Sequence, residues 1–154
     1  MKTLVIGYGN ESRRDDGIGW FVAGELAARN LPGVDVQTLH QLEVELAADL
    51  AGYDRVIFID ASVPESPDAI RCSAVAASFE SHAVAHYLTP ADVLSLSRTL
   101  YGHDPRAILF SIRGDDFDFG MFLTPRVEQA GREVVRRIEE MVTVPSSNLP
   151  VLYA

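Results

Sequence analysis

The fold of this chain is decided by residues 4–19, which read LVIGYGNESRRDDGIG. An apolar run comes first, two glycines follow it, and a polar loop then carries two adjacent carboxylates, Asp15 and Asp16. After this loop the apolar residues recur at the three- and four-residue spacing of one helix face. The stretch therefore predicts a buried strand over residues 3–8, a tight turn, and a helix over residues 17–29.

The two adjacent carboxylates allow two interpretations. Negative charge is favourable near the positive end of the helix dipole, so Asp15 and Asp16 can simply stabilise the start of the helix. Alternatively, the loop presents a carboxylate above the edge of the sheet, where a ligand would bind. The residues alone leave both interpretations open.

Composition limits the class of protein. A chain of 154 residues with 47% apolar residues is long enough to bury the core of one domain. The net charge of −9 argues against binding to nucleic acid or to an anionic membrane surface. The single cysteine, Cys72, excludes an intramolecular disulfide and fits a reducing compartment. With neither a signal peptide nor an apolar run of about 20 residues, we expect a cytoplasmic protein.

Strands and helices alternate along the rest of the chain. Strands are predicted at residues 34–39, 55–59, 69–76 and 106–112, and helices at residues 43–51, 89–101 and 125–142. Alternation of this kind, with near-continuous apolar strands, indicates a parallel sheet that is covered on both faces. The predicted fold is α/β, a single doubly wound domain over residues 1–143 with a mostly parallel sheet, followed by a tail over residues 144–154.

Two of the helices begin at a threonine followed by a proline, Thr89-Pro90 and Thr124-Pro125. Threonine is a good N-cap residue and proline fits the first helical turn, so each pair predicts a helix start. An acidic loop with glycine and aromatic residues lies at 113–123, before the second pair, and its segment at 115–118 is interpreted as a solvated loop.

Four titratable residues are expected near one edge of the sheet. Ligands of such folds bind at the carboxyl ends of the strands, where Asp16, His40 and Asp60 each follow or end a predicted strand. The first and third strands are usually neighbours, so Asp16 and Asp60 are expected side by side; His86 precedes a helix. Two carboxylates and an imidazole suit a divalent metal such as nickel or zinc. Taken singly, Asp60 fits a loop-capping role equally well, and each histidine fits an ordinary surface residue.

Several sharper motifs are absent. Ser12 stands where a dinucleotide-binding fingerprint has its third glycine. The chain contains neither a phosphate-binding loop with lysine nor a Gly-x-Ser-x-Gly nucleophile elbow. A phospho-acceptor receiver domain would need a lysine at the end of its last strand, and the only lysine is Lys2.

Four sequence blocks follow one another along the chain. The first block is Gly-x-Gly-Asn, four variable residues and then Asp-Asp-Gly, and the second is an apolar strand ending in Asp-Ala. The third is a histidine shortly before a leucine-rich helix, and the fourth is Leu-Thr-Pro before the last helix. The blocks lie at residues 7–17, 56–61, 86–94 and 123–125. In this order they resemble the [NiFe]-hydrogenase maturation proteases, and the register of the third block selects His86 over His82.

The resemblance implies a hydrolase, an endopeptidase of aspartic or metal-dependent type. Its substrate would be a [NiFe]-hydrogenase large-subunit precursor, from which it removes the C-terminal extension after nickel insertion. Asp16, Asp60 and His86 would be both the catalytic residues and the metal ligands, and the nickel would be carried by the precursor, although other divalent metals fit the same ligands. The alternative is a non-catalytic nickel-sensing or scaffolding protein for the immature subunit, which would need the same three residues.

Some residues depart from the family pattern or indicate a subgroup. Asp16 stands where glutamate is frequent, and Ser12 stands where leucine is common. The segments at 40–47, 101–103 and 117–120 are similar to the subgroup that serves bidirectional, NAD(P)-coupled hydrogenases.

Overall fold

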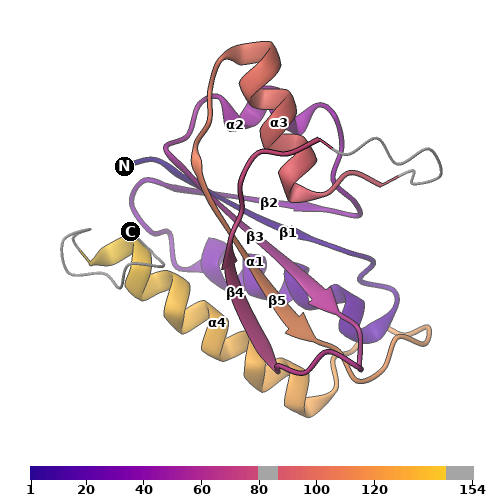
Figure 1. Cartoon of the computed structure of the whole chain (residues 1–154). Helices are drawn as coiled ribbons and strands as arrows, with labels where there is room; N and C mark the ends of the chain where they lie inside the picture. Colours follow the sequence, from indigo (N-terminus) through magenta and orange to yellow (C-terminus); the bar gives the residue numbers. More distant parts are fainter. Residues whose placement is uncertain (80–86, 145–154) are drawn as a thin grey trace.

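The computed structural model describes residues 1–79 and 87–144, and its centre is a five-stranded sheet (Figure 1). The order of the strands is β2-β1-β3-β5-β4. All neighbours are parallel except β4, which runs antiparallel to β5 at one edge. The strands are β1 (Thr3–Tyr8), β2 (Val34–Leu39), β3 (Arg55–Ser62), β4 (Ile70–Ala74) and β5 (Arg106–Arg113). The predicted α/β class with a mostly parallel sheet is confirmed.

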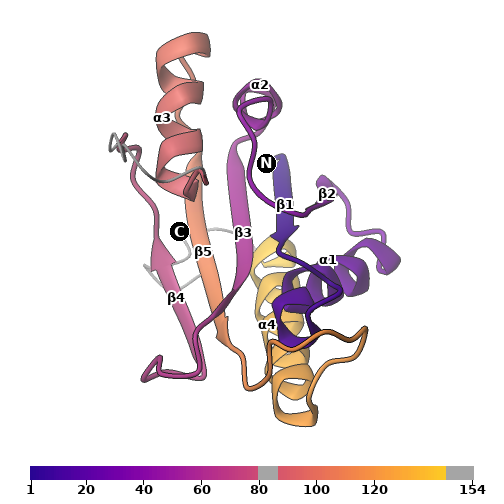
Figure 2. The same cartoon turned by 90° about the vertical axis from the view of Figure 1, so that its right-hand side faces the viewer.

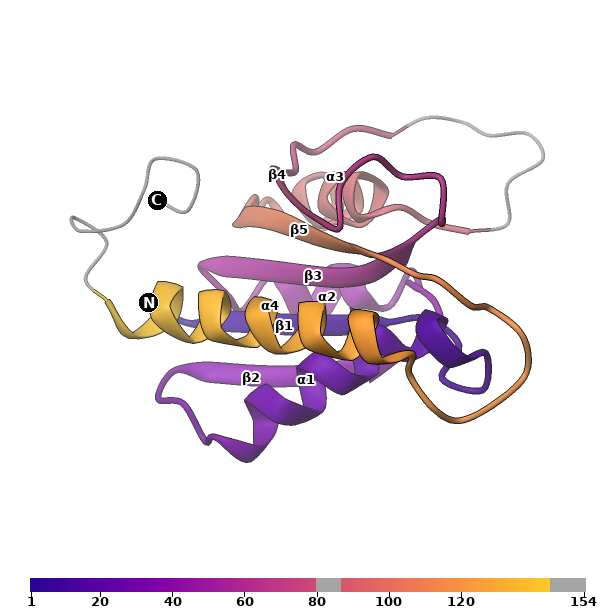
Figure 3. The same cartoon turned by 90° about the horizontal axis from the view of Figure 1, so that it is seen from below.

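Helices cover both faces of this sheet. The short 3-10 turn η1 leads into α1, which packs against α4 on one face, while α2 packs against α3 on the other (Figures 2 and 3). Their bounds are η1 (Arg14–Gly17), α1 (Ile18–Ala28), α2 (Leu46–Leu50), α3 (Pro90–Tyr101) and α4 (Pro125–Thr143). Within the described ranges, no helix has the length and apolar character needed to cross a membrane.

The near-continuous apolar strands fill two separate cores. Successive side chains of a strand point to opposite faces of a sheet. In β3, Ile57 therefore packs with α1 and α4, whereas Val56 and Phe58 pack with α2 and α3. Because both faces are covered, the central strands are apolar at nearly every position, which is the pattern visible in the sequence.

Several element boundaries differ from the prediction, and three of these differences concern α1, α2 and β3. The expected helix at 17–29 begins as the 3-10 turn η1, and the helix expected at 43–51 is reduced to α2 at Leu46–Leu50. The third difference bears on the site, because β3 continues past Asp60 to Ser62. It does so because β5 keeps pairing with it, whereas the pairing between β1 and β3 ends at Ile59. The boundary at 143/144 stays a prediction, since residues 145–154 lie outside the described ranges.

Candidate active site

A pocket of about 380 Å³ lies at the carboxyl ends of β1, β2 and β3. It contains both carboxylates that the sequence places after the first and third strands, together with backbone and side chains from the turn after β1. The lining residues are Tyr8, Gly9, Asn10, Arg13, Asp16, His40, Gln41, Leu42, Asp60, Ala61, Tyr87 and Leu88. Parallel strands direct their carboxyl ends to one edge, so residues far apart in the chain meet here.

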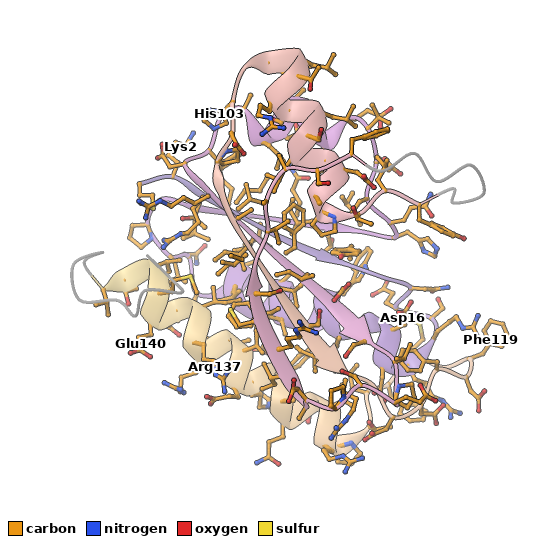
Figure 4. The ribbon with its side chains drawn as sticks, in the orientation of Figure 1. Lys2, Asp16, His103, Phe119, Arg137 and Glu140 are labelled. Carbon is orange, nitrogen blue, oxygen red and sulfur yellow. The ribbon has the colours of Figure 1, made fainter. Side chains whose placement is uncertain are left out.

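Asp16 lies in η1, part-buried, and its position is fixed by the turn after β1. The backbone N–H of Asn10 donates to Oδ2 of Asp16 at 2.7 Å. Gly9 has a φ of +139°, and a Cβ built there would lie 2.2 Å from the carbonyl oxygen of Asp16. Only glycine permits this close approach of the two segments, which explains the second glycine of the motif. Figure 4 shows Asp16 at the end of the sheet where β3 also ends.

Asp60 lies on β3, between the two strands that flank it. The Tyr8 hydroxyl, from β1, donates to Oδ2 of Asp60 at 2.9 Å, and the Ser111 hydroxyl, from β5, donates to Oδ1 at 3.0 Å. Desolvation by burial raises the pKa of Asp60 to about 6, and the charge of Asp16 adds to this effect. The two hydrogen bonds act in the opposite direction because they stabilise the ionised carboxylate.

Burial also affects Tyr8, one of the two hydroxyl donors to Asp60. Burial, and then the nearby Asp60 carboxylate, raise the pKa of Tyr8 above its usual range. Tyr8 therefore keeps its proton at neutral pH and acts as a hydrogen-bond donor to Asp60.

Of the two histidines predicted near this edge of the sheet, the structure describes only His40. His40 is exposed and lines the pocket, but the described residues contain no group of three His, Cys, Asp or Glu side chains close enough to hold a metal ion. His86, the third predicted site residue, lies outside the described residues, and so does His82. Tyr87 and Leu88, which follow His86 in sequence, line the pocket.

The other carboxylate of the pair, Asp15, is fully buried and serves the structure. It accepts four hydrogen bonds: from the backbone N–H of Asp115 and Asp116 at 2.8 and 2.9 Å, and from the N–H and hydroxyl of Thr124, both at 2.8 Å. Asp15 thereby fixes the loop between β5 and α4 against the turn after β1. The two members of the acidic pair therefore differ in position: Asp15 is buried against this loop, whereas Asp16 lines the pocket, and ligand binding by Asp16 stays a prediction.

The structure refines two predictions about this loop. The last helix begins at Pro125 as predicted, with Thr124 at its N-cap position, but the Thr124 side chain makes no capping hydrogen bond to α4 and its hydroxyl donates to Asp15. Thr89, by contrast, forms the predicted cap at the start of α3. The loop itself is not simply solvated, since Asp116 forms an ion pair with Arg14 and Asp115 forms one with Arg126.

Sequence reasoning missed three residues of the site. Arg13 lines the pocket, and Tyr8 and Ser111 bind Asp60. Ser111 had a usable signal, because it is a polar residue inside an apolar strand. In the parallel register of β3 and β5 it stands opposite Asp60, but that register is known only from the structure.

Comparisons with known proteins agree with this fold. No protein-family model matches the chain, and neither does any curated protein sequence. Among solved structures, the hydrogenase maturating endopeptidase HybD from E. coli is 26% identical, with a TM-score of 0.71 and 90% of each chain covered. An endopeptidase from Escherichia coli is 25% identical, with a TM-score of 0.72, and the match covers 97% of this chain and 100% of the other.

A third solved structure is similar to this chain in fold. The [NiFe] hydrogenase maturation protease HycI from Thermococcus kodakarensis KOD1 has a TM-score of 0.74 at 19% identity, with 93% of each chain covered. The matches span nearly the whole of each chain, and the two most distinctive sequence blocks contribute to one pocket. The predicted resemblance to the [NiFe]-hydrogenase maturation proteases is confirmed by these matches.

Proposed function

We propose that this protein is the endopeptidase that removes the C-terminal extension of a [NiFe]-hydrogenase large-subunit precursor after nickel insertion. The observation that carries the proposal is the joint position of Asp16 and Asp60 in one pocket at the carboxyl edge of the sheet. The likeness to the hydrogenase maturating endopeptidase HybD from E. coli, at 26% identity, supports this class of substrate.

In this proposal Asp16, Asp60 and His86 bind the nickel that the precursor carries. Two carboxylates in one pocket repel each other, and a cation on the substrate removes that repulsion. A precursor without nickel brings no such cation, so the carboxylates favour the loaded form. His86 precedes Tyr87, a pocket residue, by one position in the chain.

Asp60 is the better candidate for the base that activates water. In the site without the substrate's nickel, its pKa of about 6 lies near neutral pH, where a general base is most effective. Hydrogen bonds to both of its oxygens hold the carboxylate in one orientation. The oxygen of the water would attack the scissile carbonyl carbon, its proton would pass to Asp60, and Asp60 would return a proton to the leaving amine.

The test of the function compares nickel-loaded and metal-free precursor. Each is mixed with the protein, and mass spectrometry follows the loss of the C-terminal peptide. We expect cleavage of the loaded precursor alone. Binding of the loaded form without cleavage would instead support the nickel-sensing scaffold, and the absence of both binding and cleavage would overturn the proposal.

A further inference from the structure

Three large apolar side chains are exposed together on the loop between β5 and α4, residues 114–124, here named the aromatic loop. Phe119 is 79% exposed, Met121 is 71% exposed and Phe122 is 56% exposed. Figure 4 shows Phe119 projecting from the body of the molecule at the same end as Asp16. Contiguous exposed apolar groups on a folded protein typically mark an interaction surface.

The backbone of the aromatic loop is fixed, so these side chains are held in their exposed positions. The N–H of Gly120 donates to the carbonyl of Ser12 at 2.8 Å, and the N–H of Arg14 donates to the carbonyl of Gly120 at 2.9 Å. The N–H of Asp15 donates to the carbonyl of Asp116 at 3.0 Å, in addition to the four bonds that the Asp15 carboxylate accepts. A fixed loop loses little conformational entropy when a partner binds to it.

Two arginines lie over the exposed rings. The guanidinium of Arg13 lies 5.1 Å from the centre of the Phe119 ring, and that of Arg14 lies 4.7 Å from the centre of the Phe122 ring. Arg14 also pairs with Asp116, whereas Arg13 has no ion pair among the residues that the structure describes. Nε of Arg13 donates to the carbonyl of Phe117 at 3.0 Å, which orients the guanidinium over the ring.

Arg13 connects the aromatic loop to the pocket, because it lines the pocket and its guanidinium lies over the Phe119 ring of the loop. A separate hollow of about 250 Å³ lies between the loop and the start of α1. Met121 and Phe122 form part of the wall of this hollow, together with Trp20 and Phe21 from α1. A partner whose chain enters the pocket would therefore meet Arg13, the exposed rings and the hollow in turn.

We propose that the aromatic loop binds the folded body of the large-subunit precursor while the C-terminal segment of that precursor occupies the pocket. This inference rests on the proposed function. The matching surface on the precursor is apolar and carries a carboxylate that pairs with Arg13. A few well-packed aromatic and arginine side chains commonly supply most of the binding energy of an interface, and this loop presents both kinds.

A second copy of this chain fits the surface less well. Two copies would each bring a net charge of −9, and a symmetric contact would place Arg13 and Arg14 close to their own counterparts. A partner bound over Arg13 in this way would also lie at the entrance to the pocket.

The test measures the cleavage kinetics of nickel-loaded precursor with three variants. The triple variant Phe119→Ser/Met121→Ser/Phe122→Ser removes the exposed apolar groups, and Arg13→Gln removes the cation. The control, Leu100→Ser/Tyr101→Ser, removes two large apolar side chains that are 59% and 53% exposed at the C-terminal end of α3. Because all the altered residues are exposed, thermal unfolding of each variant should stay close to that of the wild type.

The proposal predicts that KM rises at least about tenfold in the triple variant, with kcat at saturation changed by less than about threefold. Arg13→Gln should raise KM in the same sense and reduce the salt dependence of KM, whereas the control variant should match the wild type. An unchanged KM in the triple variant would overturn the inference while leaving the proposed function intact. A dimer in solution that the triple variant converts to monomers, with KM unchanged, would show that a second copy covers the surface. A wild-type protein that neither binds nor cleaves the loaded precursor would overturn both.

Discussion

The two adjacent carboxylates Asp15 and Asp16 should differ sharply in their effect on stability. Replacing Asp15 by alanine removes the acceptor for three backbone N–H groups and one hydroxyl in a fully buried position. The hydroxyl can rotate toward another acceptor, but the three N–H groups cannot. An unsatisfied donor that is fully buried costs about 1–3 kcal/mol, so three would cost about 3–9 kcal/mol; this is an upper range, because these hydrogen bonds are part-buried. Opening of the aromatic loop to water limits this loss, and we expect about 3–5 kcal/mol.

Asp16→Ala is the matched comparison, because the same residue type is truncated one position along the chain. Asp16 is part-buried and accepts a single backbone hydrogen bond, from Asn10 at 2.7 Å. Its truncation should lower the free energy of unfolding by about 1 kcal/mol. Domains of this kind have a total stability of about 5–15 kcal/mol, so Asp15→Ala should remove a large share of it.

Urea unfolding at pH 7, followed by circular dichroism, measures both variants with the wild type beside them. The Asp15→Ala midpoint should fall well below the Asp16→Ala midpoint, provided that the slope of free energy against urea stays constant. Equal midpoints for the two variants would refute the argument that Asp15 fixes the aromatic loop.

Three further predictions concern the pocket. The native state binds the Asp60 proton more tightly than the unfolded state, because the native pKa is about 6 rather than 3.8. Asp60 therefore favours folding at low pH, and about 3 kcal/mol of stability should be lost between about pH 4 and pH 6. Urea titrations at pH 4 and pH 7 should show this loss in the wild type relative to Asp60→Asn; an equal pH dependence in both would contradict it. Tyr8→Phe removes a hydrogen bond that lowers the pKa of Asp60. In the pH profile of the cleavage rate, the rise on the acid side should therefore move to higher pH. An unchanged profile would argue against Asp60 as the base. Gly9→Ala should destabilise the fold by more than about 2 kcal/mol, because its Cβ would overlap the Asp16 carbonyl. Gly24→Ala has open space around its Cβ, so it should leave stability unchanged or raise it by up to about 1 kcal/mol. Equal thermal stabilities of the two variants would contradict this prediction.

Much of the fold follows from local patterns in the sequence. The strand, the two glycines and the acidic turn at residues 4–19 predict β1, the turn and α1 because each signal acts within a few residues. The parallel sheet then follows from the alternation of elements and from strands that are apolar on both faces. Once the sheet is parallel, the side-by-side position of Asp16 and Asp60 follows from its topology alone.

The rest depends on contacts between distant parts of the chain. The sequence leaves the roles of Asp15 and Asp16 undivided, because the groups that bind Asp15 lie 100 to 109 residues away. The same distance explains why Thr124 looks like a helix cap and acts instead as a donor to Asp15. The continuation of β3 past Asp60 depends on its pairing with β5, which no local pattern records. The roles of Asp16, Asp60 and His86 in binding nickel stay predictions, as does the subgroup.

The measurement that tests the central claim most directly is cleavage of nickel-loaded precursor by the wild type, Asp16→Asn and Asp104→Asn, each followed by mass spectrometry. Asp104 is an exposed carboxylate before β5, at the opposite edge of the sheet from the pocket. The account predicts that the wild type and Asp104→Asn release the C-terminal peptide at similar rates, while Asp16→Asn releases none on the same timescale. Release by Asp16→Asn at the wild-type rate would contradict it.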